Sequence, residues 1–419
     1  MNGSKMPTSS PEGAGPSPAC GWIRPGVVVH DPFACVDALL ASFAFALGAR
    51  GFRVLGYVQV PRPDGRGPPL YLDLATGTAL PQEPGAAEAF LRRAMSGAAD
   101  LLVIGRFSAC TEATDHVGAP IGAGTGRGLP MLTAIAGQAI HQWHSYVRHD
   151  GSMLAPDPRA LWTWWGPDRL YRDLALGVDD AEARRITIGP RWILVEGPHG
   201  AGLAALPRHP RDLLARLPEL RRRSLRELAA LTASWDPMET AVGVAALNAH
   251  YNRYDLEGRP GNGAHRFRQV EGQVVVIGAF PGVDGILPRC AVVEADPRPG
   301  AYPIAAMDAL LPGCGGAIVN SSALINRSLP RILRLAGSRP IALVGLSTPM
   351  TPRLHDYGVE TLGGLLVHDP QGLAQAVAAG ALPRDFTRFG RYAHVSGSAS
   401  AKRSGGRDTD TRTERQMRV

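Results

Sequence analysis

Lysine is almost absent from this chain. Of the 44 basic side chains in the 419 residues, only Lys5 and Lys402 are lysines, and each lies close to one end of the sequence. A Walker-type phosphate loop places a lysine on the β- and γ-phosphates, and a pyridoxal phosphate enzyme needs a lysine for its Schiff base. The sequence between the two lysines therefore excludes both mechanisms, and pyridoxal phosphate (PLP) is not an expected cofactor.

Cysteine pairs and long apolar runs are missing as well. The five cysteines stand apart without a C-x-x-C pair, so neither a disulfide framework nor a cysteine zinc site is indicated. No apolar run reaches the roughly 18 residues of a membrane span. The first twenty residues are rich in Pro, Ser and Gly and have no apolar core. They are typical of a disordered tail rather than a signal peptide, so we expect a cytoplasmic protein.

The net charge of +7 does not favour a nucleic-acid partner, because the basic residues are distributed along the chain rather than clustered. Residues 401–419 hold six basic and three acidic side chains, so much of the excess lies in the C-terminal tail. The triplet RRR at 221–223 belongs to a charged helix and is typical of a solvated face. The expected partner is a small ligand or a metal chelate, and a homo-oligomer remains open.

Strand-like and helix-like segments alternate over most of the chain, which indicates an α/β protein with mostly parallel sheets. The front part has the order of a P-loop domain, but its first strand leads into HDPFACVD, which lacks the glycines of a phosphate loop. A hairpin and two helices interrupt the alternation in the middle of the chain. We predict a disordered tail 1–22, an N-terminal parallel-sheet α/β domain 23–166, a small α+β domain 167–256, a Rossmann-like α/β domain 257–395 and a disordered basic tail 396–419.

Five candidate strands in the last domain each end in a polar or glycine-rich loop. The strands are QVVVIG, CAVVE, GAIV, IALVG and GLLV, and the first ends at Gly278. Because the carboxyl ends of parallel strands share one edge, where open sheets bind ligands, their polar residues should gather round one crevice. These residues are Glu294, Asn320, Ser321, Ser322, Ser347, Thr348 and His368.

The stretch AIVNSSALINRSL at 317–329 allows two interpretations. Asn326 or Ser328 is placed to cap the following helix, which has Pro330 in its first turn. Capping does not account for residues 320–322, which come earlier, at the end of the strand. We therefore expect these three residues to line a ligand site.

At this point the sequence resembles a known family. Residues 170–380 resemble the heavy-metal chelation family. The segments that carry this resemblance are SWDPMETAVGVAALNA, GAFPGV, VVEADPRPGAYP, NSSALINRSLPRIL and ALVGLSTPMTPRLHDYGVETLGG. The resemblance implies an enolase-N-terminal-like domain followed by a Rossmann-like domain, with a site between the two. It implicates Asn248, Phe280, Pro281, Glu294, Ser321, Ser322, Asn326, Ser347 and Thr348.

The front of the chain resembles a second, uncharacterised family, often encoded beside molybdate-transport or nitrogenase genes. The segments that carry this resemblance, over residues 25–165, include VVVHDPFACVDALLASF, LDLATG, DLLVIGRF and GLPMLTAI. It implies no reaction for this domain.

The leading hypothesis is a protein that binds a metal ion, a metal chelate or an oxyanion, with a link to molybdenum. Oxygen and amide donors dominate the candidate site, and His355 and His368 are candidate nitrogen ligands for a metal. One alternative is an enzyme that uses a dinucleotide or S-adenosylmethionine, with Glu294 on a ribose. Another is a structural or regulatory interaction protein.

Overall fold

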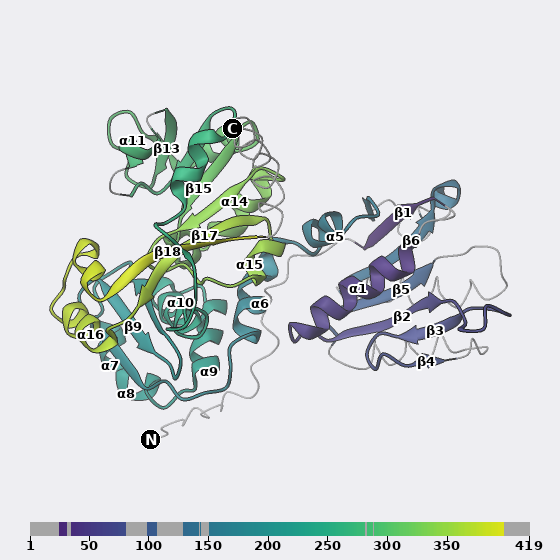
Figure 1. Cartoon of the computed structure of the whole chain (residues 1–419), viewed down its shortest axis with the longest axis horizontal. Coiled ribbons are helices and arrows are strands. Elements are labelled where there is room, and N and C mark those ends of the chain that lie inside the picture. Colours follow the sequence, from purple (N-terminus) through teal and green to yellow (C-terminus); the bar gives the residue numbers. More distant parts are fainter. Residues whose placement is uncertain are drawn as a thin grey trace, which may run out of the picture. The chain divides into compact units, whose positions relative to one another are not determined.

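The computed structural model describes residues 25–31, 35–80, 99–106, 129–141, 143, 151–280, 283–287 and 289–397. These residues form two compact units (Figure 1). The first takes the described residues up to Asp37 together with Leu55–Met153, and the second takes Ala38–Val54 and those from Leu154 onwards. The predicted site residue Pro281 and the predicted tails lie outside the described residues, except that the last strand still includes Ser396.

The first unit is built on a seven-stranded sheet with the order β4-β3-β2-β5-β6-β1-β7. Its strands are β1 (Gly26–His30), β2 (Val54–Val60), β3 (Leu70–Asp73), β4 (Ala79–Leu80), β5 (Leu101–Arg106), β6 (Met131–Ala136) and β7 (Ser152–Leu154), and α1 (Val36–Ala49) follows β1 in the chain. β6 pairs in parallel with β1 and β5, whereas β2, β3 and β4 form an antiparallel ladder. The central strands are buried apolar runs, as parallel strands usually are. The predicted parallel-rich N-terminal sheet is confirmed.

The second unit begins with an α+β lobe, here called the first lobe. Its three-stranded sheet has the order β10-β9-β8. The strands are β8 (Arg185–Ile188), β9 (Trp192–Glu196) and β10 (Ala201–Ala205), and β9 and β10 form the predicted antiparallel hairpin. The helices of this part are α5 (Pro158–Trp165), α6 (Leu170–Leu176), α7 (Arg211–Ala215), α8 (Leu217–Leu220), α9 (Leu225–Ala229) and α10 (Pro237–Tyr251).

Helix α10 lies directly on strand β10. Asp236 caps the helix by accepting a hydrogen bond from the backbone N–H of Met238 at 3.1 Å, as its Asp-Pro start predicts. A Cβ added to Gly202 of β10 would lie 2.2 Å from the carbonyl oxygen of Ala245. Only a glycine allows this approach, so the side chains of α10 meet the backbone of β10.

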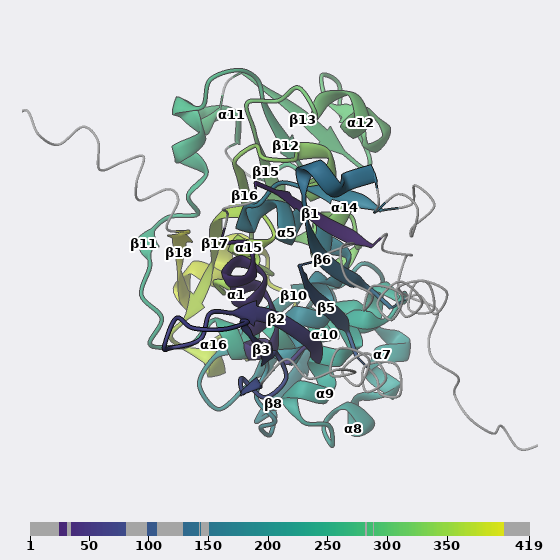
Figure 2. The ribbon, with the colours of Figure 1, turned by 90° about the vertical axis from the view of Figure 1, so that its right-hand side faces the viewer.

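The rest of the second unit, here called the second lobe, is an eight-stranded sheet with the order β11-β18-β17-β16-β15-β12-β13-β14. The strands are β11 (Arg259–Pro260), β12 (Val274–Ile277), β13 (Cys290–Glu294), β14 (Tyr302–Pro303), β15 (Gly316–Asn320), β16 (Ile341–Val344), β17 (Val359–Val367) and β18 (Gly390–Ser396). The helices are α11 (Val283–Ile286), α12 (Met307–Leu310), α13 (Ser322–Ile325), α14 (Leu329–Ala336), α15 (Arg353–Asp356) and α16 (Pro370–Ala378). The strands from β17 across to β14 are parallel, and β18 is antiparallel to β17. Figure 2 shows the labelled strands β12, β15, β16 and β17 following one another in this sheet. This confirms the predicted α/β class.

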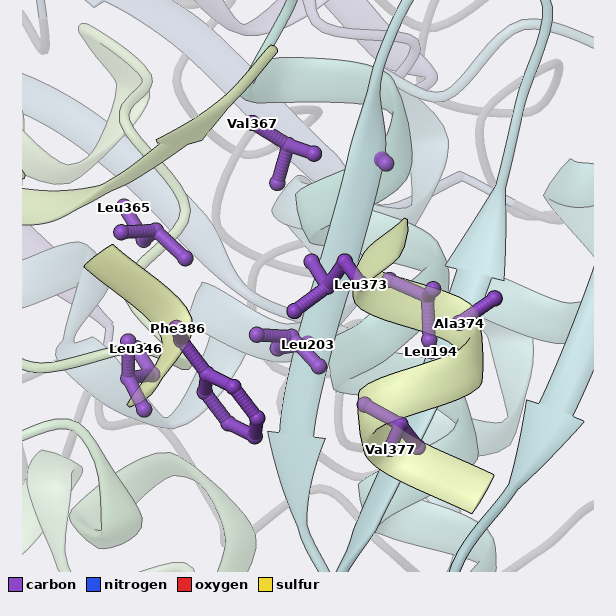
Figure 3. Packing of buried hydrophobic residues seen from close by; sticks show 10 residues of the cluster. Leu194, Leu203, Leu346, Leu365, Val367, Leu373, Ala374, Val377 and Phe386 are labelled. Carbon is purple, nitrogen blue, oxygen red and sulfur yellow. The ribbon is translucent and has the colours of Figure 1, made fainter. Parts of the chain in front are cut away.

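One apolar core joins the two lobes. Figure 3 shows Leu203 of β10 between Leu373 of α16 and Phe386, while Leu365 and Val367 of β17 lie beside them. All of these side chains are buried. Because strands of both sheets supply this cluster, the two lobes are parts of one folded body.

The helices of the described residues are short, with α10 the longest at 15 residues. None of them is long and apolar enough to cross a membrane.

Candidate functional site

Four strands of the second lobe end at one level. Ile277 of β12 is paired with Val293 of β13 on one side and with Val319 of β15 on the other, and Val319 is in turn paired with Leu343 of β16. The next residues along these strands are Gly278, Glu294, Asn320 and Val344, which therefore share the carboxyl edge of the sheet. This edge is the position at which open parallel sheets bind ligands.

Gly278 and Asn320 touch at this edge. Gly278 has a φ of 74°, in the left-handed region, and a Cβ added to it would lie 2.9 Å from the Cβ of Asn320. The amide oxygen of Asn320 accepts a hydrogen bond from the N–H of Ser322 at 3.0 Å, at the start of α13. Glu294, Asn320 and Phe280 are half-buried and Ser322 is exposed. Polar atoms of this edge are therefore open to solvent.

Ser321 and Ser347 face the other way, into the contact between the lobes, and both are buried. The hydroxyl oxygen of Ser321 accepts a hydrogen bond from the N–H of Ser347 at 3.2 Å. The hydroxyl oxygen of Ser347 accepts one from the N–H of Ala205 in β10 at 3.3 Å. The loops after β15 and β16 are thus tied to each other and to the first lobe. Consecutive residues of the Asn-Ser-Ser loop serve different purposes, with Ser321 joining the loops and Ser322 open to solvent.

Asn252, which directly follows α10, holds the loop after β16 at two points. Its Nδ2 donates to the carbonyl oxygen of Thr348 at 2.9 Å, and its Oδ1 accepts from the N–H of Met350 at 2.8 Å. The sequence analysis missed this residue. It lies four positions after Asn248, a spacing that places both amides on one helix face, and this spacing was the available signal.

Asn248 and Thr348 each keep a buried oxygen unpaired. The Nδ2 of Asn248 donates to the carbonyl oxygen of Leu203 in β10 at 2.8 Å. The Oδ1 of Asn248 and the Oγ1 of Thr348 have no hydrogen-bond partner among the described residues, although both residues are 0% exposed. Buried polar atoms are normally paired, so these two oxygens need an explanation.

Asn326 organises the turn between α13 and α14. Its Oδ1 accepts hydrogen bonds from the N–H of Ser328 at 3.0 Å and from the Ser328 hydroxyl at 2.7 Å. Ser328 occupies the N-cap of α14 but makes no side-chain cap bond, because its hydroxyl points back to Asn326. The predicted capping is therefore corrected: Asn326 shapes the turn before the helix, and neither side chain bonds an N–H within α14.

Arg327 ties this turn to the first lobe. It has a φ of 60°, and its guanidinium lies 4.3 Å from the ring centre of Tyr171 and 4.6 Å from that of Trp235. The guanidinium also donates to the carbonyl oxygen of Ser234 at 3.1 Å, and the Tyr171 hydroxyl donates to the carbonyl of Leu324 at 2.8 Å. These contacts fix α13, which carries Ser322, against the first lobe.

The two histidines proposed as metal ligands do not come together. His355 precedes β17 and its Nδ1 bonds the carbonyl of Val359, whereas His368 follows the far end of this nine-residue strand. A strand of this length separates its ends by roughly 30 Å. His368 also lies beyond the common edge, because β17 is already level with Val344 at Gly363. The expectation that His368 joins the other candidates is thereby corrected. The described residues contain no group of three or more His, Cys, Asp or Glu side chains that could hold a metal ion.

Comparison with known families agrees with the motifs. Residues 265–396 match the family described as "Putative heavy-metal chelation" (DUF364), and residues 171–251 match a second family with the same description (DUF4213). The resemblance predicted for the second unit is thereby confirmed. Residues 80–164 match a family described as a protein of unknown function (DUF2478).

Individual proteins match this chain at low sequence identity. A protein of unknown function from the DUF364 family of Desulfitobacterium hafniense is 26% identical, with a TM-score of 0.49, and the match covers 55% of this chain and 97% of that one. A DUF364 protein of Pyrococcus horikoshii is 22% identical, with a TM-score of 0.47, and the match covers 55% of this chain and 98% of that one. The molybdenum import ATP-binding protein ModC 2 of Bradyrhizobium diazoefficiens is 27% identical in an alignment of 161 residues, and the match covers 34% of this chain but only 18% of that protein.

Proposed function

We propose that the second unit binds a metal ion, a metal chelate or an oxyanion where the loops after β15 and β16 meet β10 and α10. The observation that carries this proposal is the pair of buried, unpaired oxygens on Asn248 and Thr348. Leaving a buried polar atom unpaired costs about 1–3 kcal/mol. A ligand that bonds both oxygens recovers this free energy, so binding is favoured at this position.

The surrounding residues support the same proposal. Side chains at the carboxyl edge extend the donor set towards solvent, and we propose that Gly278, Phe280, Pro281, Glu294, Asn320, Ser322 and Asn326 surround the outer part of the ligand. Both family descriptions of the second unit favour a metal. The relative concerned with molybdenum import makes molybdenum one candidate. We propose a cytoplasmic protein with domain limits at 23–166, 167–256 and 257–395.

A dinucleotide or S-adenosylmethionine is less well supported. Glu294 does end β13, where an acidic residue would hold a ribose. However, Phe280 packs against the apolar core of the second lobe two residues after Gly278, and Asn320 crowds Gly278 itself. This loop leaves little room for the close backbone approach that a pyrophosphate requires.

Calorimetric titration of the full chain with Mn²⁺, Ni²⁺, molybdate, NAD and S-adenosylmethionine tests the proposal. Ser322→Ala removes an exposed hydroxyl and should weaken metal or oxyanion binding about tenfold or more, since a hydrogen bond to a charged ligand contributes about 1.5–3 kcal/mol. It should leave the melting temperature unchanged. Ser321→Ala is the matched control. It removes the buried acceptor of the Ser347 N–H and should lower stability by about 1–3 kcal/mol.

Saturable binding of NAD or S-adenosylmethionine, with no binding of metal or oxyanion, would contradict the proposal. Absence of binding by all five compounds would favour the interaction protein instead.

A further inference from the structure

The guanidinium of Arg327 is held on one side and open on the other. Its Nη1 donates to the carbonyl oxygens of Thr232 and of Ser234, the second at 3.1 Å. Its Nε and Nη2 have no hydrogen-bond partner among the described residues. Arg327 is half-buried, and neither nitrogen belongs to the buried atoms that lack a partner, so both reach solvent. Two N–H donors of a fixed group are therefore available to a ligand.

The charge of Arg327 is not neutralised by a carboxylate. Within the part of the chain that the structure describes, Arg327 forms no ion pair with an acidic side chain. By contrast, Arg331 is paired with Asp308 at 2.5 Å. The first turn of α14, which begins two residues after Arg327, has no acidic side chain either. This position therefore favours an anion.

Backbone and aromatic contacts hold Arg327 in place. Among the described residues it is the only one besides glycine with a positive φ, 60°. This conformation is disfavoured for a residue with a Cβ, and it is kept where surrounding contacts impose it, often at functional sites. The guanidinium lies between the rings of Tyr171 and Trp235, and Trp235 is 75% exposed. A side chain that is ordered in advance loses little freedom on binding, which favours binding.

The turn that carries Arg327 starts at the carboxyl edge of the sheet. The amide oxygen of Asn320, the last residue of β15, accepts from the N–H of Ser322. The carbonyl oxygen of Ser322 accepts from the N–H of Asn326 at 3.0 Å. Asn320, Ser322 and Asn326 are among the residues that surround the outer part of the proposed ligand. Arg327 directly follows Asn326, so its charge acts on this outer part.

We propose that Arg327 binds an anionic group of the ligand, and that its Nε and Nη2 donate to two oxygens of a carboxylate or of an inorganic oxyanion. This inference rests on the proposed function and assigns a negative charge to the outer part of the ligand. A guanidinium matches two oxygens of one such group through two parallel hydrogen bonds. A bare metal cation would be repelled by Arg327, so the ligand is an anionic chelate or an oxyanion.

Calorimetric titration of the full chain with citrate and with molybdate tests this assignment. Citrate supplies carboxylates and molybdate supplies an inorganic oxyanion, so the tighter of the two identifies the source of the anionic group. We expect saturable binding of at least one. Arg327→Gln removes the charge and the two parallel donors and should weaken this binding about tenfold or more. Arg327→Lys keeps the charge without the parallel donors and should keep only part of the affinity.

Arg331→Gln is the matched control. It removes the same charge four residues further on, from an exposed side chain that is paired with Asp308. It should leave the affinity nearly unchanged, because salt screens an exposed charge that does not touch the ligand.

Trp235→Ala is a second variant, which keeps Arg327 and removes one of the two rings beside it. Binding should weaken roughly two- to fivefold, the contribution of an exposed cation–π contact. The melting temperature should change little, because the ring is mostly exposed. This variant tests the inference even if Arg327→Gln is unstable.

Three results would overturn the inference: no binding of citrate or molybdate, binding that Arg327→Gln leaves intact, or an equal loss in Arg327→Gln and Arg331→Gln. The proposed function stands in each of these cases if the wider titration finds binding of a metal ion or an oxyanion. If it finds neither, the proposed function itself fails.

Discussion

Asn252 and Thr348 connect the two lobes of the second unit through a buried hydrogen bond of 2.9 Å from the asparagine amide to the threonine carbonyl. The same amide accepts from the N–H of Met350, so a single side chain satisfies two backbone groups of the loop after β16. Asn252 is 1% exposed, so both hydrogen bonds are shielded from solvent. The loop that carries Ser347 and Thr348 therefore depends on a residue outside the second lobe.

Replacement of Asn252 by alanine should destabilise the protein strongly. It leaves the Thr348 carbonyl and the Met350 N–H buried without partners, at about 1–3 kcal/mol each. Urea unfolding should show a lower midpoint than in the wild type. Asn326→Ala is the control, since Asn326 is an exposed asparagine that shapes one turn, and it should cost only about 1 kcal/mol. Equal midpoints for the two variants would show that the two hydrogen bonds of Asn252 do not contribute to stability.

Replacement of Gly278 by alanine tests the geometry of the carboxyl edge. Its positive φ disfavours any residue with a Cβ, and the added Cβ would press against Asn320. We expect a loss of about 1–3 kcal/mol in unfolding free energy, together with weaker ligand binding as Asn320 shifts. Gly313→Ala is the control, because no atom lies within 4 Å of its added Cβ. A Gly278→Ala protein with normal stability would mean that the edge is not closely packed at this point.

His394 should make stability depend on pH. Burial lowers the pKa of His394, and the nearby positive charges of Arg266 and Arg259 lower it further, while a bond to the carbonyl of Gly261 opposes the shift. The unfolded chain takes up this proton near pH 6.5, and the folded chain only at lower pH. The unfolding free energy therefore has its full value above about pH 6.5, and it decreases as the pH falls below about 6.5.

Urea midpoints measured at about pH 7.5 and about pH 5.5 check the sign of this effect. The wild type should lose stability at the lower pH, and His394→Gln should lose less. An equal loss in both proteins would assign the pH dependence to other groups, such as His250, whose pKa is also lowered by burial.

The sequence predicted the strands of the second lobe. It also predicted that Gly278, Glu294 and Asn320 lie at the edge of the sheet where these strands end. That success follows from apolar runs that stop at polar or glycine-rich residues. It did not predict that Ser321 turns into the contact between the lobes, because alternation along a strand does not define side-chain directions in the loop that follows. Nor did it predict the position of His368. The run GLLV was expected to be the whole strand, whereas β17 begins five residues earlier, at Val359, and the Gly363–Gly364 pair lowers its strand propensity.

Strand β17 also determines how a ligand could enter. Its first half pairs with β16 in the parallel sheet, and its second half supplies Leu365 and Val367 to the core that contains β9 and β10 (Figure 3). A hinge that separated the lobes would have to pull these side chains out of a shared apolar core. Access to Asn248 and Thr348 must instead come from a local displacement of the loop after β16, with release of Asn252 as its first step. Ligand exchange should accordingly be slow. Its rate should be set by the lifetime of the hydrogen bonds of the Asn252 side chain rather than by a motion of the two lobes relative to each other.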